Sequence, residues 1–280
     1  MDDVQANSLS VQRNVVLGLL LALAAGAWAV LVWQSADAHM DMTMASSTMG
    51  LRAPLFLAIW VTMMVAMMFP TAVPMILTFH KVQTGKRERG DAFVSTWVFV
   101  AAYILVWTLA GVAAYAGALA AEAVAVRAAL SSTTAARIGG AVIILAGIYQ
   151  ITPLKDLCLS KCRTPLTFIM TSWRDGAVGA LRMGLLHGTY CLGCCWLLFV
   201  ILFPLGIMNI AAMAVITLIV FAEKTLPWGR LAPRVTAAAL VAYGAVVVAA
   251  PQVLPTFQKD GAAMPAEMHM PGSGNAPAMK

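Results

Sequence analysis

Charge is what this sequence has least of. Only 11% of its 280 residues are Asp, Glu, Lys or Arg, whereas soluble domains carry about a quarter. So few charges cannot coat a soluble particle of this size, and no polar block long enough for a separate soluble domain interrupts the apolar runs. The composition therefore excludes a soluble protein and predicts an all-α fold, a polytopic bundle of transmembrane helices in a lipid bilayer.

Several functional signatures are also missing. No P-loop of the G-x-x-x-x-G-K-[ST] type occurs, so the chain is not expected to drive transport with a nucleotide by itself. The chain has only four histidines, and none of them can be assigned to a Ser/His/Asp catalytic triad. A role other than catalysis is therefore favoured. The net charge of +6 is not gathered in a basic patch interleaved with aromatics, so nucleic acid is not an expected partner.

Long apolar runs, in contrast, recur along the whole chain. Because about 20 apolar residues cross a bilayer, these runs predict about seven transmembrane helices. The runs cover residues 14–33, 54–79, 93–120, 137–152, 180–203, 206–222 and 235–250. The first run also resembles a signal peptide, but its length favours a retained helix.

Three regions follow from this pattern. Residues 1–53 hold the first helix and an outer loop containing Met and His, and residues 54–250 form a membrane core of about six helices with the Cys motifs. Within the core, the basic and amphipathic segment 153–176 is expected to be a loop or an interfacial helix. Residues 251–280, rich in Pro, Gly, Ala and Met, are expected to be a disordered outer tail.

The distribution of Lys and Arg predicts the orientation of the bundle. With the N-terminus inside, thirteen of the eighteen basic residues lie on the inner side, and five lie outside: Arg52, Arg127, Arg137, Lys259 and Lys280. Inner loops of membrane proteins carry such an excess of basic residues. We therefore expect the N-terminus inside and the C-terminus outside.

Three cysteines and a histidine share one face of the fifth run. At 100° per residue, Cys191, Cys194 and Cys195 lie about 40°, −20° and 80° from His187. The motif Gly184-x-x-x-Gly188 on the same face would let a neighbouring backbone approach closely. Three thiols and an imidazole are a ligand set for Cu(I) or Zn. Cysteine also packs as a small hydrophobe, but this grouping favours metal or redox chemistry.

A second pair of cysteines, Cys158 and Cys162, lies one helical turn apart. The basic residues Lys155, Lys161 and Arg163 would favour their thiolates. The alternative is a pair of ordinary reduced thiols in a cytoplasmic segment. The two clusters would meet only if segment 153–176 folded back against the fifth run, and the sequence leaves this open.

Methionine is abundant, with 18 residues. In the second run, Met64 and Met68 share a helix face with Met75, and thioethers select Cu(I). A Met stripe is nevertheless more often core filling. Two polar segments, both outside by the charge pattern, also combine Met and His: His39, Met40, Met42 and Met44, and then Met268, His269 and Met270. These segments resemble copper-capture sequences, although chance composition explains such tracts equally well.

An acidic and a basic residue, Glu223 and Lys224, end the sixth run. Ionisable residues at membrane depth are costly and indicate function. At the edge of a helix, however, they can simply snorkel and pair, and this interpretation is favoured.

These motifs together resemble a bacterial family of predicted metal-binding integral membrane proteins, domain of unknown function 2182. The resemblance covers about residues 55–230 and rests on Tyr149-Gln-x-Thr-Pro-Leu-Lys-x-x-Cys158-Leu-x-x-Cys162-Arg-x-Pro165 and Gly184-x-x-x-Gly188-x-x-Cys191-x-Gly-Cys194-Cys195-Trp196. The Met-rich run 63–70 and Glu223-Lys224 fit the same pattern. The resemblance implies an integral membrane protein that binds a metal, and it brings no known reaction.

The sequence thus favours a multi-pass protein of a bacterial inner membrane that handles copper by transport, capture or delivery. Its cargo would be a metal ion, Cu(I) before Zn, and its partner a metallochaperone or a metalloenzyme; an oligomer is left open. One alternative is a membrane thiol-disulfide oxidoreductase that uses the pairs Cys158/Cys162 and Cys191/Cys194. Another is an accessory or assembly subunit of a membrane complex, for which the cysteines would be dispensable.

Overall fold

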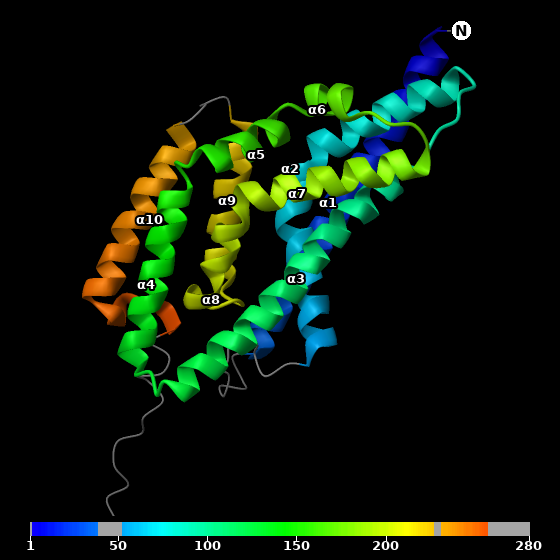
Figure 1. Cartoon of the computed structure of the whole chain (residues 1–280). Helices are drawn as coiled ribbons and strands as arrows, with labels where there is room; N and C mark the ends of the chain where they lie inside the picture. The colour runs from blue at the N-terminus through cyan, green and yellow to red at the C-terminus, as the bar shows by residue number, and fades with distance from the viewer. Residues whose placement is uncertain (1, 39–51, 227–230, 257–280) are drawn as a thin grey trace, which may run out of the picture.

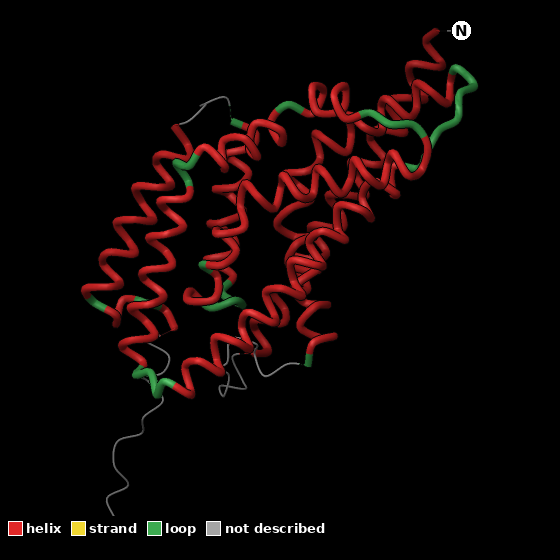
Figure 2. Tube along the Cα trace, in the orientation of Figure 1, coloured by secondary structure: helices red, strands yellow, loops and turns green. Residues whose placement is uncertain are grey.

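The computed structural model describes residues 2–38, 52–226 and 231–256 of the chain (Figure 1). These residues form helices joined by short loops, and no strand occurs among them (Figure 2). The expected all-α fold is therefore confirmed.

The helices differ widely in length. The long ones are α1 (Asp2–Ala38), α2 (Ala53–Glu88), α3 (Thr96–Arg127), α4 (Ser132–Tyr149), α7 (Gly176–Val200) and α10 (Leu231–Ala249). The short ones are α5 (Pro153–Arg163), α6 (Pro165–Ser172), α8 (Leu202–Leu205) and α9 (Ile210–Thr225), and a 3₁₀ turn, Pro251–Val253, follows α10.

Within the described ranges, six helical segments are long and apolar enough to cross a membrane. They correspond to the first five expected runs and to the last one. The sixth expected run, 206–222, forms α9 instead, which has 16 residues. At 1.5 Å per residue α9 is about 24 Å long, shorter than a hydrocarbon core of about 30 Å. Six of the about seven expected spans are thus candidates by length and composition, and α9 is too short to be counted among them.

A turn before α9 explains why this helix is short. Gly206 follows α8 with φ of +94°, a left-handed conformation that glycine adopts readily. Asn209 then caps α9, because its side chain accepts a hydrogen bond from the backbone N–H of Ala212. The helix therefore begins at Ile210, four residues later than the apolar pattern suggests.

Helices that are neighbours in sequence pack together, as do some that are far apart. Helix α1 packs on α2, α2 on α3, α3 on α7, and α4 on α10. The contact between α3 and α7 depends on glycine. A Cβ atom on Gly184 would lie 2.5 Å from the carbonyl oxygen of Phe99, and one on Gly188 would lie 2.8 Å from Val106. The expected close approach of a backbone to this Gly-x-x-x-Gly motif is confirmed.

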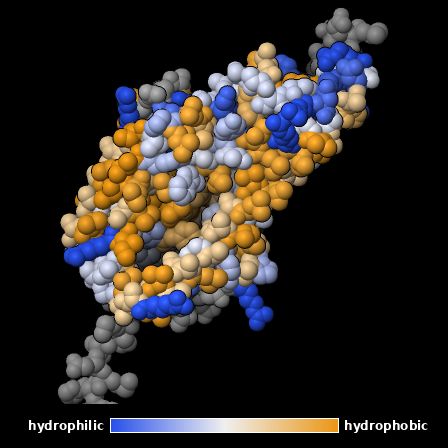
Figure 3. Space-filling view, in the orientation of Figure 1, coloured by the Kyte–Doolittle hydropathy of each residue, from blue (hydrophilic) through white to orange (hydrophobic). Residues whose placement is uncertain are grey.

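The surface is apolar between two more polar ends. Large hydrophobic side chains are exposed along the helices; Leu109 on α3 and Leu218 on α9 are 59% and 66% exposed. Figure 3 shows hydrophilic residues gathered toward the two ends of the molecule, with apolar surface between them. Such a surface is unfavourable in water but suits the hydrocarbon of a bilayer.

Segment 153–176 contains the two short helices α5 and α6, which lie at the end of the molecule where α10 begins (Figure 1). Thr152 caps α5 by accepting a hydrogen bond from the backbone N–H of Lys155. From this cap α5 turns back and packs on α7. The fold thus places the cysteines of α5 against those of α7.

Candidate metal centre

The two cysteine clusters meet where α5 packs on α7. The Cys162 side chain lies close enough to the thiols of Cys191 and Cys194 to interact with both. One turn earlier, Cys158 lies against the backbone of Gly193, where an added Cβ atom would be 2.8 Å from the Cys158 sulfur. The structure therefore answers the question that the sequence left open: α5 folds back far enough for the thiols of both motifs to form one group.

The three cysteines of α7 are buried, and two of them donate hydrogen bonds to the backbone of the third. The thiols of Cys194 and Cys195 both donate to the backbone carbonyl of Cys191, over sulfur–oxygen distances of 3.1 and 2.8 Å. None of the three side chains is more than 2% exposed. The Cys191 sulfur does not bond to this carbonyl. It is contacted instead by side chains of other helices.

A lysine and a tyrosine supply those contacts. The Nζ atom of Lys224 lies 3.0 Å from the Cys191 sulfur and 3.3 Å from the hydroxyl oxygen of Thr71 on α2. The Tyr103 hydroxyl on α3 lies 3.1 Å from the same sulfur. Side chains of α3 and α9 thus contact the Cys191 thiol, and Thr71 of α2 contacts the same lysine. The sequence interpretation did not include Tyr103 or Thr71 in the site, because neither belongs to a motif.

The interpretation of Glu223 and Lys224 as snorkelling residues is wrong. They are only 2% and 9% exposed, because the C-terminal end of α9 packs against α2, α5 and α7 rather than reaching a polar surface. The cost of burying charge at this depth could have pointed to the site from the sequence.

A buried ion pair lies beside the thiol group. The Lys155 Nζ atom is 2.6 Å from a carboxylate oxygen of Glu223, and it also donates to the side-chain oxygen of Gln150. Lys155 and Glu223 are almost completely buried. The pair ties α5, which carries Cys158 and Cys162, to α9, which carries Lys224. Removing one partner of such a pair costs about 3–5 kcal/mol, so this tie holds the elements of the site in place.

A buried histidine lies one turn before Cys191. His187 is 3% exposed, and neither of its ring nitrogens has a hydrogen-bond partner. Its ring stacks on Phe99 and Tyr103, with ring centroids 5.9 and 5.5 Å apart, and meets the edge of Phe168. Buried polar atoms are nearly always satisfied, so an imidazole with two unpaired nitrogens is suited to a ligand.

The methionine face of α2 is directed toward the same region. Met64 and Met68 are completely buried. At 100° per residue they lie about 20° and 60° around the helix from Thr71, whose hydroxyl contacts Lys224. The thioethers therefore share a helix face with a residue of the thiol group, while they also fill the core between helices.

Comparison with known protein families adds an independent observation. A family model described as a copper chaperone, PpoB2, matches residues 57–247, which is more than half of the chain. The chain belongs to this copper chaperone family. The matched range includes both Cys motifs, the Met face of α2 and Glu223-Lys224, and it agrees with the metal binding that the sequence resemblance implied. No curated protein and no solved structure matches the chain.

The copper chaperone match does not extend to the two Met/His segments. His39, Met40, Met42 and Met44, like Met268, His269 and Met270, lie outside the described residues. Their assignment as capture sequences stays a prediction.

The expectation that nearby cations favour thiolates on α5 is not met. Lys155 is directed to Glu223 and Gln150, and Arg163 donates to the backbone carbonyl of Leu226. Hydrogen bonds to Cys191 and Cys194, together with burial, hold the pKa of the Cys162 thiol well above its ordinary value. Burial likewise raises the pKa of Cys158.

Three thiols of this copper chaperone family member, those of Cys191, Cys194 and Cys195, already take part in hydrogen bonds. All five cysteines are free. In the described part of the chain, no three Cys, His, Asp or Glu side chains are arranged to hold a metal ion together. Binding of an ion therefore requires the thiols to rotate away from the Cys191 carbonyl and toward one another.

Proposed function

We propose that this chain binds Cu(I) as cargo at the buried thiols of α5 and α7 and delivers it to a metallochaperone or metalloenzyme in the membrane. The observation that carries the proposal is the contact of Cys162 with Cys191 and Cys194. It joins two motifs, separated in sequence, into one group of soft ligands. Thiolates select Cu(I), and membership of a copper chaperone family supports the same cargo.

The ligands have distinct roles under this proposal. Cys162 and Cys191 supply the two primary thiolates, and Cys158, Cys194 and Cys195 lie close enough to exchange with them. His187 offers a neutral imidazole on the same face of α7. The site therefore contains more ligands than one ion needs. Such a surplus suits a protein that must release its cargo, because the ion can pass from one donor to the next.

Lys224 balances the charge of the loaded site. Two thiolates and one Cu(I) carry a net charge of −1, which is costly in a buried environment. The Lys224 ammonium group, 3.0 Å from the Cys191 sulfur, makes the sum zero. The same charge would make a two-thiolate Zn(II) site positive, so Lys224 favours the monovalent ion.

The route of the ion follows the sulfur atoms. The Met/His segments, on the outer side by the charge pattern, collect Cu(I), and the thioethers of Met64 and Met68 lead it toward the thiols. The bundle is oriented with its N-terminus inside and its C-terminus outside, in the inner membrane of a bacterium. This orientation requires α9, although shorter than a full span, to return the chain from α8 to the end of the bundle where α10 begins (Figure 1).

The experiment that tests this function is Cu(I) binding in competition with a chromophoric chelator. The protein is purified in mild detergent without a metal-binding tag, and wild type is compared with Cys162→Ser and Cys191→Ser. Substituting a residue that only orients a metal ligand typically weakens metal binding by about 10–100-fold, so loss of a direct ligand should weaken it by at least about 100-fold.

Ser160→Ala is the matched control, because Ser160 lies on the exposed side of α5 between the two cysteines. It should bind Cu(I) as wild type does. Equal affinity of all four proteins would refute the proposed ligands. Thiols recovered as disulfides, with no copper bound by wild type, would favour the oxidoreductase alternative instead.

A further inference from the structure

The packing of α4 on α10 leaves a pocket of about 560 Å³ at one end of the two helices. The pocket is separate from the thiol group and has no part in the proposed copper site. Its lining comes from the last turn of α4, the first turn of α5 and the first half of α10: Gly147, Ile148, Gln150, Ile151, Asp156, Pro233, Arg234, Ala237, Ala238 and Val241.

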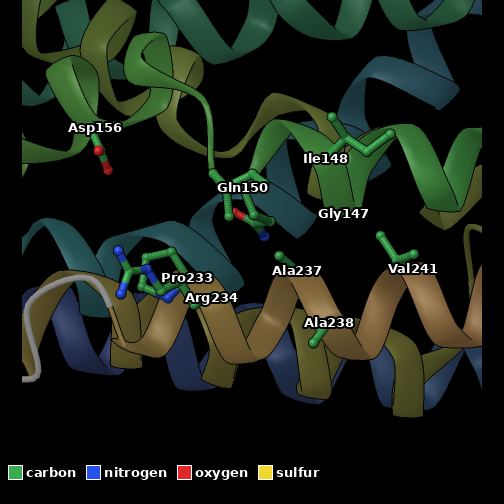
Figure 4. A pocket seen from close by; sticks show the side chains of 10 residues that line it. Gly147, Ile148, Gln150, Asp156, Pro233, Arg234, Ala237, Ala238 and Val241 are labelled. Atoms are coloured by element: carbon green, nitrogen blue, oxygen red, sulfur yellow. The ribbon is translucent and has the colours of Figure 1, made fainter.

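The lining is polar at one end and apolar at the other. Asp156 and Arg234 lie at the same end of the pocket, and Val241 lies at the opposite end (Figure 4). From Arg234 to Val241 the wall extends about 10 Å along α10, with alanines between them. A ligand that follows this wall must therefore be charged at its head and apolar along its length.

Gln150 provides a hydrogen-bond donor that has no partner within the protein. Its side chain is 1% exposed, and its oxygen accepts from Lys155. Its nitrogen, in contrast, is buried without a hydrogen bond. Figure 4 shows the amide between α4 and α10, inside the pocket. Because a buried donor without a partner is destabilising, this nitrogen is suited to a bound acceptor.

We infer that the pocket holds a phospholipid with a primary amine in its headgroup, such as phosphatidylethanolamine. The phosphodiester accepts from the Gln150 amide and the exposed Arg234 guanidinium, since Arg and amide donors suit phosphate oxygens. The ammonium group meets the Asp156 carboxylate at the same end. One acyl chain lies along the wall of Ala237, Ala238 and Val241.

Such a lipid would act on the rest of the bundle through Gln150. The nitrogen of this amide binds the phosphodiester, while its oxygen accepts from Lys155, which is paired with Glu223. The lipid therefore fixes the orientation of the amide that supports the tie between α5 and α9. We expect delipidated protein to unfold at a lower temperature and to regain stability when the lipid returns.

The test uses delipidated, copper-free, full-length protein in detergent. Native mass spectrometry and the thermal unfolding midpoint report on added phosphatidylethanolamine, phosphatidylglycerol with the same acyl chains, and soluble phosphoethanolamine. We expect phosphatidylethanolamine to bind at least about tenfold more tightly than either of the others, because only it places an ammonium group beside Asp156, a phosphodiester beside Arg234 and an acyl chain on the apolar wall.

Three variants probe the parts of the pocket. Ala238→Trp fills it, Arg234→Gln removes the cation, and Gln150→Glu removes the amide donor but keeps an oxygen for Lys155. Each should weaken lipid binding by at least about tenfold. The matched control is Ala239→Trp, which adds the same indole at the next exposed position of α10, outside the pocket lining. It should bind the lipid as wild type does.

Unfolding midpoints without lipid show whether both tryptophan variants are folded. Equal lipid binding by Ala238→Trp and Ala239→Trp would overturn the site. Equal binding of phosphoethanolamine would overturn the lipid as its occupant, and equal binding of phosphatidylglycerol would overturn recognition of the amine. All of these outcomes are independent of copper binding.

Discussion

Lys224 is the residue on which the selectivity of the proposed site depends. Its ammonium group is the cation in contact with the Cys191 sulfur, and it is held there by Thr71 as well. Lys224→Met keeps the length of the side chain and removes the charge. We expect it to lower the Cu(I) affinity at least tenfold, because the loaded site then keeps an uncompensated buried charge, and to leave Zn(II) binding unchanged or stronger, because the two-thiolate Zn(II) site becomes neutral. Competition titrations with both ions measure the ratio of the Cu(I) affinity to the Zn(II) affinity.

Two further variants make this test specific. Lys224→Arg retains the charge and should keep the preference for Cu(I), with an affinity between those of wild type and Lys224→Met. Lys161→Met removes a lysine from α5, one residue before Cys162, and should leave the Cu(I)/Zn(II) ratio unchanged. If the loss of either lysine changed the Cu(I)/Zn(II) affinity ratio equally, net charge rather than the contact with Cys191 would determine the preference.

At the scale of elements, the contact between α5 and α7 depends on the absence of a side chain at position 193. Gly193→Leu would drive α5 away, because even a Cβ atom would be 2.8 Å from the Cys158 sulfur. We expect a loss of about 1–3 kcal/mol of stability, the usual cost of overpacking, and weaker Cu(I) binding because Cys162 moves from Cys191. Chemical unfolding and chelator competition would measure the two effects.

Gly117→Leu is the control for this substitution. Gly117 lies in α3 with no atom within 4 Å of an added Cβ, and its position is exposed. A leucine there should leave copper binding unchanged and stability equal or higher, since leucine is the better helix former. Similar losses at both positions would mean that helix propensity or membrane insertion, not the α5–α7 contact, explains the effect of Gly193→Leu.

The sequence predicts those parts of the site that depend on local spacing. One face of α7 carries His187, Cys191 and Cys194 because the helical period places them there, and the same holds for the Met face of α2. The fold-back of α5 is a tertiary property, since the packing at Gly193 and the Lys155–Glu223 pair bring together residues far apart in sequence. No local pattern encodes them.

The length of α9 shows a second limit. The apolar pattern from 206 to 222 is uniform, so hydropathy predicts a full span. The positive φ of Gly206 and the cap at Asn209 delay the helix, and this delay leaves Glu223 and Lys224 among other helices. Turn chemistry therefore outweighs composition at this point, and the burial of Lys224 follows from it.

For the whole molecule, the charge pattern and the fold lead to one prediction about sidedness. Helices α5 and α6 lie at the end of the bundle where α2 ends and α10 begins, and α4 begins at the opposite end (Figure 1). With basic residues inside, Glu88 at the end of α2 is internal and Ser132 at the start of α4 is external. Both positions are exposed. Ser132→Cys should therefore react with a membrane-impermeant maleimide in intact cells, whereas Glu88→Cys should react only after permeabilisation.

The parent protein controls for labelling of Cys158 and Cys162, which are partly accessible and belong to the inner end. The orientation matters for copper because it decides which side reaches the thiols. Cys162 and Lys224 are on elements of the inner end, so the predicted labelling would mean that ions collected outside must pass the Met face of α2 to reach them. The reverse labelling pattern would place the thiol group near the outer surface and the Met/His segments on the inner side, which would contradict the proposed collection of Cu(I) from outside.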